Sequence, residues 1–584
     1  MAKRGDSSNT LTGASHGHAD ALRALRAAVS GSTFPLPVPS AEPARAAAAA
    51  MIAQIDDYAL SRLTRPDAPL LVGVGGPTGA GKSTTINSLI RAPASATGVL
   101  RPTTRVPVLV CHPADAAWFR TGPLLAGLVR TSGPTTDPDH LQVVTAPALP
   151  AGCAFLDTPD IDSVVSANRV VAAKLLAAVD LWLFVTTAAR YADAVPWQVL
   201  RTAQQRGVAV AVLLNRVVDA AAGEVTAHLS GMLEASGLGG TPLFAIPESR
   251  VDGQGLLPEP VVAPVREWFD ALAADERARA DVARQTLDGA LAALSREAEG
   301  LAAALDDQRA AAEELAERVG MAYGAARAMV ERGIGDGALL GGEVLARWRE
   351  FVGPGGGIRA VLDAGRRRNR LLAGRSRVGR ELITALESSL VRLLRSAITD
   401  AVDDAHRAWS GHPAGAVLLV AEAGPDLAVP ASAHAPDGAP DQVARLVYDW
   451  RRESLDLVAA GTGGGRARAA ALSAGALVLL GATAPEQVWA AAGDDRDIQT
   501  VAAKAREDLL TRAAVLIDTE AARYLDRLAD VPLDGAQARQ VRKAAAALES
   551  ARLADRVAPR ARTDGAPVEE APTGGAPVDE KARP

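Results

Sequence analysis

The sequence contains very little cysteine and few aromatic residues. Only Cys111 and Cys153 occur among 584 residues, which excludes a disulfide framework and a cysteine-rich zinc site. So little cysteine suits a reducing compartment, and we expect a cytoplasmic protein. Aromatic residues make up 3% of the chain, which leaves little material for a surface on which RNA bases could stack.

An excess of positive charge is also missing. The chain has 62 Lys and Arg against 68 Asp and Glu, a net charge of −6. Proteins that coat nucleic acids need a surplus of cations to displace counterions, so we expect no nucleic-acid partner. With 48% hydrophobic and 22% charged residues, the composition is that of a folded globular chain.

Long apolar runs without charge are absent as well. The first twenty residues are polar and contain no signal-peptide core. The segment 469–485 has no charge over 17 residues. A helix needs roughly 20 apolar residues to span the bilayer, so this segment is short for that role. We therefore expect a chain that is neither secreted nor membrane-spanning, and a buried bundle helix at 469–485.

Short β-branched runs alternate with helix-forming segments over residues 65–255. This alternation predicts an α/β domain with a mainly parallel sheet and helices on both faces. The expected strands are LLVGVGG, VPVLVCHP, LQVVTAP, CAFLDTPD, LWLFVTTA, VAVAVLLN and TPLFAIPE.

Strand patterns stop beyond residue 255, and residues 256–556 read as an extended α-helical bundle or stalk. Residues 264–331 have no proline after Pro264 and predict one long helix. An apolar heptad seam runs along it, which fits a helix buried in a bundle better than a dimeric coiled coil, because two seam positions are Ala. The seam residues are Leu287, Leu291, Leu294, Ala298, Leu301, Leu305, Ala312, Leu315 and Val319.

The two ends of the chain have different compositions. Residues 1–18 and 557–584 are polar or rich in Pro, Gly and charge, and we expect both to be disordered. Residues 19–64 predict two helices, 19–30 and 41–63, separated by a proline-rich stretch. These N-terminal helices are expected to pack on the helical region or on the α/β domain.

The strongest motif follows the first expected strand. The run Gly76-Pro77-Thr78-Gly79-Ala80-Gly81-Lys82-Ser83-Thr84 fits G-x-x-x-x-G-K-[ST] and leads into a helix. Small residues let backbone N–H groups wrap a phosphate, and the following helix adds its positive end. We expect all nine residues to bind nucleotide, with Lys82 on the β- and γ-phosphates and Ser83 as a Mg²⁺ ligand.

Two further positions fit the same chemistry. Asp157 ends the apolar strand CAFLD, so its carboxylate is expected to hold Mg²⁺. Thr104 lies in the run RPTTR between the two motifs. We expect Thr104 to cover the γ-phosphate and Mg²⁺ and to hold the attacking water, which makes Lys82 and Thr104 the candidate catalytic residues.

The runs GPTGAGKST, RPTT, LDTPDID and VLLNRV, in this order, resemble those of TRAFAC-class GTPases. Among these GTPases the chain is most similar to the bacterial dynamin-like proteins of the dynamin superfamily. The motifs cover about a third of its length, and beyond Ser249 the resemblance rests on architecture. This resemblance implies GTP hydrolysis with Mg²⁺, coupling to a helical stalk, and self-association or pairing with a paralogous partner. It also implies membrane remodelling at a cytoplasmic face, such as that of the inner membrane, and base contacts from Asn215 and Arg216.

Two positions depart from the pattern of similar proteins. Asp160 stands where they have the Gly of D-x-x-G, and Asp219 comes one place late for the guanine-binding N/T-K-x-D. The preference for GTP over ATP therefore rests on the resemblance. These departures keep open an alternative: a nucleotide-binding scaffold with weak or no hydrolysis that acts with a paralogous partner.

Two segments are candidates for an anionic membrane surface. The resemblance implies a lipid-inserting tip near 469–485, the alternative to the buried helix. A basic cluster can meet lipid head groups or form a solvated helix face. Its members are Arg359, Arg366, Arg367, Arg368, Arg370, Arg375, Arg377 and Arg380.

Overall fold

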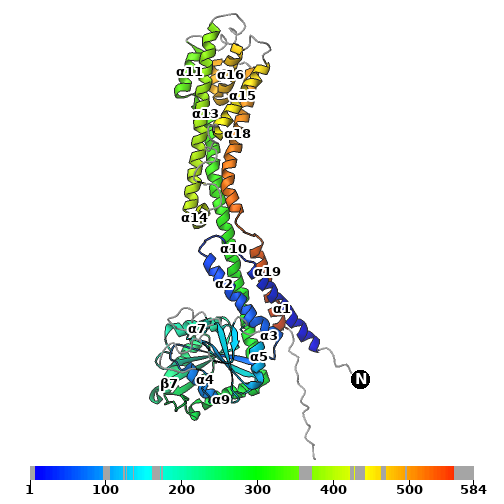
Figure 1. Cartoon of the computed structure of the whole chain (residues 1–584), viewed down its shortest axis with the longest axis vertical. Coiled ribbons are helices and arrows are strands. Elements are labelled where there is room, and N and C mark those ends of the chain that lie inside the picture. The colour runs from blue at the N-terminus through cyan, green and yellow to red at the C-terminus, as the bar shows by residue number, and fades with distance from the viewer. Residues whose placement is uncertain are drawn as a thin grey trace, which may run out of the picture. The chain divides into compact units, whose positions relative to one another are not determined.

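The computed structural model describes residues 7–95, 106–160, 171–353, 371–420, 441–461, 468–492 and 496–557, together with Leu427 and apart from a few positions within 123–138 and 173–174. The chain divides into two compact units (Figure 1). Unit 1 contains residues 1–31, 47–301 and 539–584, and unit 2 contains residues 32–46 and 302–538.

Unit 1 is built on one mainly parallel sheet. Within the described residues eight strands pair in the order β3-β4-β2-β5-β1-β6-β7-β8. Strands β5, β1, β6, β7 and β8 run parallel, and β2 pairs antiparallel with β5 and parallel with β4. The bounds are β1 Leu70–Gly75, β2 Val108–Cys111, β3 Val129–Thr131, β4 His140–Thr145, β5 Cys153–Asp157, β6 Leu181–Thr187, β7 Ala209–Val217 and β8 Leu243–Pro247.

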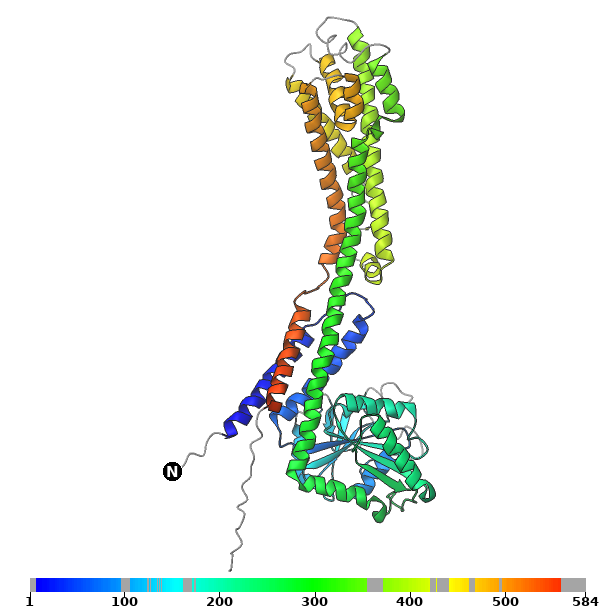
Figure 2. The same cartoon turned by 180° about the vertical axis from the view of Figure 1, so that it is seen from behind.

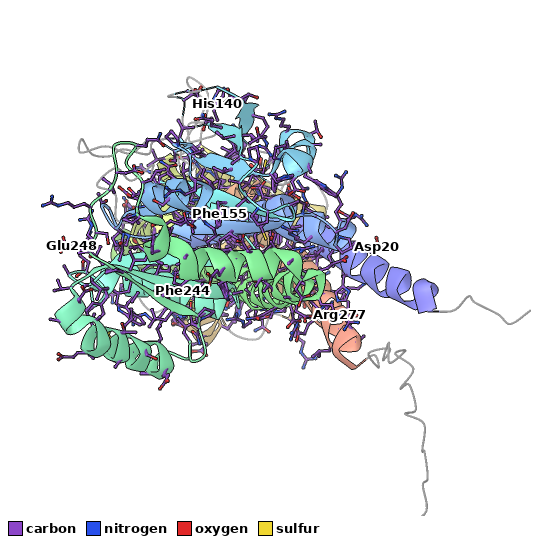
Figure 3. The ribbon with its side chains drawn as sticks, turned by 90° about the horizontal axis from the view of Figure 1, so that it is seen from below. Asp20, His140, Phe155, Phe244, Glu248 and Arg277 are labelled. Atoms are coloured by element: carbon purple, nitrogen blue, oxygen red, sulfur yellow. The ribbon has the colours of Figure 1, made fainter. Side chains whose placement is uncertain are left out.

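The seven expected strands are confirmed, and β3 is an additional short edge strand. The central strands β1, β5 and β6 are buried along their whole length, which explains why their sequences are apolar runs without alternation. Figure 3 shows His140 in β4 and Phe244 in β8 towards opposite sides of the sheet. The expected α/β fold class is therefore confirmed.

Helices α4 (Lys82–Ile90) and α9 (Glu259–Ala274) cover one face of the sheet. Phe155 of β5 is labelled in Figure 3. Its ring meets that of Phe269 of α9 edge to face, with ring centroids 4.9 Å apart. The apolar face of α9, with Val262 and Val265, completes this core. Helix α9 thus belongs to the α/β domain, whereas we expected the helical region to begin at residue 256.

The single helix expected over residues 264–331 is wrong, because the helix is interrupted at Asp275. Helix α9 ends at Ala274 and α10 runs from Glu276 to Gly335. Asp275 has extended backbone, and its carboxylate accepts hydrogen bonds from the N–H groups of Arg277 (2.9 Å) and Ala278 (3.1 Å). The side chain caps α10, because it satisfies donors that a continuous helix would have paired internally.

The N-terminal segment forms α1 (Ser7–Ser30), α2 (Ala41–Gln54), a π-helical turn over Ile55–Ala59 and α3 (Leu60–Thr64). Helix α1 begins inside the segment 1–18 that we expected to be disordered, because extending an existing helix costs far less than starting one. Residues 1–6 lie outside the described residues, as do 558–584 of the expected C-terminal tail. Helix α3 packs on the α/β domain through Arg62, which bonds to the carbonyl oxygens of Ala68 and Pro69.

The C-terminal helix α19 (Gln537–Val557) also contributes to unit 1. Its Arg552 bonds to Asp288 (3.0 Å) and its Arg542 to Glu299 (2.9 Å), both on α10. The expected range 256–556 for the helical bundle therefore includes a helix whose residues belong mainly to unit 1.

Unit 2 is a bundle of long helices (Figure 2). Residues of α10 from 302 onward pack with α11, α13, α15, α16 and α18, so the expected bundle is confirmed. Trp409 and Tyr524 meet edge to face at 5.1 Å in its interior, and the Trp409 indole N–H donates to the Leu315 carbonyl oxygen (3.1 Å). The bounds are α11 Gly342–Val352, α13 Leu371–Ser410, α14 Pro413–Val420, α15 Gln442–Gly461, α16 Arg468–Thr483, α17 Pro485–Ala492 and α18 Arg496–Ala529.

Helix α16 carries residues 469–483 of the charge-free segment 469–485. Its residues from Gly475 through Thr483, and the following Ala484, are buried in the bundle. Small residues allow this, because a Cβ at Gly475 would lie 2.3 Å from Leu455, and one at Gly481 would lie 2.2 Å from Trp489. The lipid-inserting tip is therefore wrong for residues 475–484, and the buried helix is correct.

No helix among the described residues is long and apolar enough to cross a membrane. Most of the basic cluster, from Arg359 to Arg370, lies outside the described residues. Arg377 donates a 2.9 Å hydrogen bond to Glu381 one turn later, as expected for a solvated helix face.

Candidate functional site

The glycine-rich loop connects β1 to α4 at the carboxyl edge of the parallel strands. Gly79 and Gly81 have φ values of 76° and 97°, which suit glycine. A Cβ at Gly76 would lie 2.0 Å from the Val185 carbonyl oxygen, and one at Gly81 would lie 2.5 Å from the Asn215 amide nitrogen. Only glycine fits these positions, and the loop passes directly into the N-terminus of α4 at Lys82.

The strands that carry the other expected residues end at the same edge. In the sheet register Val74 of β1 lies opposite Asp157 of β5, and Thr187 of β6 lies opposite Asn215 of β7. Strand β1 lies between β5 and β6 in the sheet. The loop that follows β1 therefore begins between the ends of these two strands. Ligands of open α/β sheets bind at such points outside the carboxyl ends of the strands.

Lys82 is buried, and its ammonium group is surrounded by oxygen atoms. Nζ donates to the carbonyl oxygens of Gly76 (3.0 Å) and Pro77 (3.2 Å). It also forms an ion pair and hydrogen bond with the carboxylate of Asp160. The candidate phosphate-binding lysine is therefore held inside its own loop and paired with the residue that departs from the D-x-x-G pattern.

Asp157 is completely buried at the end of β5. Its Oδ2 accepts hydrogen bonds from the hydroxyl groups of Ser83 (2.6 Å) and Ser95. Burial raises the pKa of this carboxyl above its ordinary value, although both serines and the charge of Lys82 oppose the shift. Within the described part of the chain, its other oxygen, Oδ1, has no hydrogen-bond partner.

This unpaired oxygen and the Ser83 hydroxyl lie at one place between α4 and β5. Buried polar atoms are nearly always satisfied, so an orphaned carboxylate oxygen needs a partner that the described residues do not supply. No group of three or more His, Cys, Asp or Glu residues with metal-ligand geometry occurs in the described ranges. A cation at this place would therefore bind to one carboxylate and one hydroxyl of the described residues.

The expected base-contacting residues follow β7. The Asn215 side chain donates to the Ala80 carbonyl oxygen (2.9 Å), and its own oxygen accepts from the Arg216 backbone N–H (2.9 Å). Asn215 therefore anchors the glycine-rich loop. Arg216 is exposed with φ 56°, and Asp219 begins a 3₁₀ turn and is also exposed.

Ser249 follows β8, and its hydroxyl donates to the Pro247 carbonyl oxygen (3.0 Å). Thr104 lies outside the described residues, so its expected role stays a prediction. The remaining loop residues Pro77, Thr78, Ala80 and Thr84 lie together with Lys82 and Ser83 between β1 and the first turn of α4.

Two residues at the site were not singled out from the sequence. Ser95 bonds to Asp157 and is positioned by Asn87, whose side chain accepts from the Ser95 N–H (2.9 Å). Arg190 follows β6 and donates to the Thr78 carbonyl oxygen (3.1 Å), while Asp193 pairs with it (2.9 Å). Neither Ser95 nor Arg190 belongs to a motif. Arg190 could still have been predicted near the site, because it follows a strand that ends at the same edge of the sheet.

Comparison with known proteins gives structural matches only. No family model matches the chain, and no curated protein matches it. It is similar to a solved structure of an oligomerised bacterial dynamin pair, described as a mechanism for long-range sensing and tethering of membranes. The identity is 10% and the TM-score 0.39, over 90% of this chain and 96% of that chain.

A second structure of the same description matches with 10% identity and a TM-score of 0.37, over 88% and 95% of the two chains. The LeoA bacterial dynamin GTPase from ETEC matches with 12% identity and a TM-score of 0.24, over 94% and 96%. Because these scores are low, the function argued below rests on the site.

Proposed function

We propose that this chain binds a nucleoside triphosphate with Mg²⁺ and hydrolyses it, with GTP as the substrate. The observation that carries the proposal is the glycine-shaped loop around buried Lys82, next to the buried pair of Ser83 and Asp157. A loop of this kind at a helix N-terminus suits a phosphate group, because N–H dipoles and an ammonium face the same space.

The orphaned oxygen of Asp157 supports the magnesium part of the proposal. Oxygen ligands from a carboxylate and a hydroxyl suit Mg²⁺, which keeps several waters and takes its other ligands from substrate phosphates. Ser83 and Asp157 are the described residues that would hold it, and Thr104 is proposed as the third protein ligand. When bound, Mg²⁺ neutralises charge on the phosphates and helps to align them.

Hydrolysis in such a site depends mainly on positioning and positive charge. Lys82 would contact the β- and γ-phosphates, and the loop amides would hold the phosphate chain. Thr104 is proposed to hold the attacking water. Asn215 keeps the loop in shape through Ala80, so its contribution to base binding is indirect in this arrangement.

Calorimetric titration of wild-type protein with GTP and with ATP, each with and without Mg²⁺, tests the proposal. We expect magnesium-dependent binding that is lost in Lys82→Ala. Lys504→Ala is the matched control, because Lys504 is an exposed residue of α18 in unit 2. Absence of magnesium-dependent binding of any nucleoside triphosphate would refute the proposal, whereas a preference for ATP would change only the base.

A second candidate is a nucleotide-binding scaffold with weak or no hydrolysis that acts with a paralogous partner. The ion pair between Lys82 and Asp160 favours it, because the lysine that should contact phosphate already has an anionic partner. Single-turnover hydrolysis separates the two candidates. Complete conversion of bound GTP within minutes by the isolated chain supports the enzyme, and bound GTP that persists for hours supports the scaffold.

The resemblance of the motifs also leads us to propose self-association and action at an anionic membrane surface. Helix α10 contains residues of both units, so it is a candidate to couple the nucleotide cycle to the bundle. We expect turnover per molecule to rise with protein concentration or with anionic liposomes. A turnover that is flat in both titrations contradicts this part of the proposal and leaves nucleotide binding untouched.

A further inference from the structure

The ammonium group of Lys82 has no donor left for a phosphate. A lysine ammonium offers three N–H donors, and three acceptors surround Nζ: the carbonyl oxygens of Gly76 and Pro77 and the carboxylate of Asp160. The two carbonyl groups belong to the loop itself. Asp160 is the one anion among these three acceptors, and the one with a side chain that can move away.

The position of Asp160 is set by the strand before it. Thr158 is buried, and its hydroxyl donates to the Val74 carbonyl oxygen (2.9 Å) on the neighbouring strand β1. Pro159 follows and restricts the backbone further. Because the backbone before Asp160 is anchored to the strand that leads into the loop, the carboxylate is held near Lys82 more firmly than one in a surface ion pair.

A terminal phosphate and this carboxylate compete for one cation. A γ-phosphate that approaches Lys82 must displace Asp160 or share the ammonium with it, and sharing brings two anions close together in a shielded place. A nucleoside diphosphate has no third phosphate group and meets less of this repulsion. The fully buried Asp157 already places another carboxyl group nearby.

We propose that Asp160 is a specificity-determining residue that competes with the γ-phosphate for Lys82 and biases the site toward nucleoside diphosphate. The inference rests on the proposed nucleotide-binding function. Triphosphate then binds only with displacement of the Asp160 carboxylate. This links the occupancy of the terminal phosphate position to the backbone that follows β5.

Equilibrium binding of GDP and of the slowly hydrolysed analogue GTPγS, each with Mg²⁺, tests the inference. ADP and ATPγS serve in the same way if the base is adenine. The variants are Asp160→Asn, which keeps the shape and removes the charge, and Asp160→Gly. Glu224→Gln is the control, since it removes one negative charge from an exposed position in the first turn of α8 (Ala222–Ala235), which follows β7.

We expect Asp160→Asn and Asp160→Gly to lower the ratio of the triphosphate Kd to the diphosphate Kd by about tenfold or more, because the competing charge is gone. The control should leave this ratio unchanged. The inference about Asp160 is overturned if wild type and both Asp160 variants bind with the same Kd ratio, or if the control lowers that ratio equally. Either result leaves the proposed nucleotide-binding function standing. Absence of binding of every nucleotide by wild type and variants overturns the proposed function as well.

Discussion

Arg62 of α3 and Asp180, the residue before β6, form an ion pair in the interior of unit 1, where both side chains are almost completely shielded from water. The Asp180 carboxylate also accepts hydrogen bonds from the Leu71 backbone N–H (2.7 Å) and the Tyr58 hydroxyl (3.2 Å). One carboxylate therefore ties the N-terminal helical segment to strand β1 of the sheet. Burial raises the pKa of Tyr58 well above its ordinary value, and the charge of Asp180 adds to this shift.

We predict that Asp180→Asn lowers the free energy of unfolding by about 3–5 kcal/mol, because Arg62 would be left as an unpaired buried charge. Urea denaturation followed by circular dichroism measures this. Asp20→Asn is the control, since Asp20 pairs with Arg23 on the surface of α1, where an ion pair adds little. Equal unfolding free energies for the Asp180 variant and wild type would show that the ion pair between Arg62 and Asp180 does not stabilise the packing of the N-terminal helical segment.

Asp157→Asn should remove the magnesium dependence of nucleotide binding without weakening the fold. The carboxylate is fully buried and its pKa is raised mainly by burial, so a neutral amide relieves the cost of burying a charge. We expect the ratio of nucleotide Kd in EDTA to that in Mg²⁺ to fall to about one. Thermal denaturation should show an unchanged or higher Tm.

Asp219→Asn is the matched control for this prediction, because Asp219 is exposed after β7. It should keep the magnesium dependence of wild type. Retained dependence in Asp157→Asn would mean that the orphaned oxygen is not a metal ligand. A large loss of Tm would instead show that the carboxylate stabilises the fold through Ser83 and Ser95.

Cys153 should make the fold less stable at alkaline pH. Burial raises the pKa of its thiol to about 12 from an ordinary 9.0. The contribution of the neutral Cys153 thiol to the unfolding free energy is complete below pH 9.0 and is lost as the pH rises toward 12. In this range the unfolded chain forms the thiolate more easily than the folded chain does. The unfolding free energy of wild type should therefore fall more steeply above pH 9 than that of Cys153→Ala, by up to about 1.4 kcal/mol per pH unit.

Thiol labelling gives an independent check of the same burial. At pH 8 both Cys111 and Cys153 should react with iodoacetamide far more slowly in the native protein than in urea. Rapid native labelling of Cys153, or parallel pH curves for wild type and Cys153→Ala, would contradict the prediction.

The α/β fold was predictable because its central strands are apolar along their whole length and alternate with helices. The helices of the bundle were predictable from their apolar periodicity, such as the heptad seam of α10. The break at Asp275 was missed, because a single capping side chain decides it and periodicity continues on both sides. The place of α9 was missed because an apolar helix face does not indicate whether a sheet or a bundle covers it.

The candidate site was predictable where local sequence determines it, from Gly76 to Ser83. Contacts between distant segments were not predictable, since they depend on how the sheet places strand ends. The bond from Arg190 to Thr78 and the pairing of Asp160 with Lys82 are of this kind. The sequence marked Asp160 only as a departure from a pattern, and the contact supplies its physical meaning.

The apolar part of helix α16 allows a test of whether this segment is buried in the bundle or faces lipid. Leu479 is almost fully buried among the helices of unit 2, so Leu479→Ala should cost about 2–5 kcal/mol of unfolding free energy through lost contacts and a cavity. Leu525→Ala in α18 is the control, because that side chain is 41% exposed and has less to lose. Urea denaturation without lipid measures both variants. A helix that faced lipid would be exposed in water and its truncation would leave stability unchanged, so equal midpoints for Leu479→Ala and wild type would contradict the buried position.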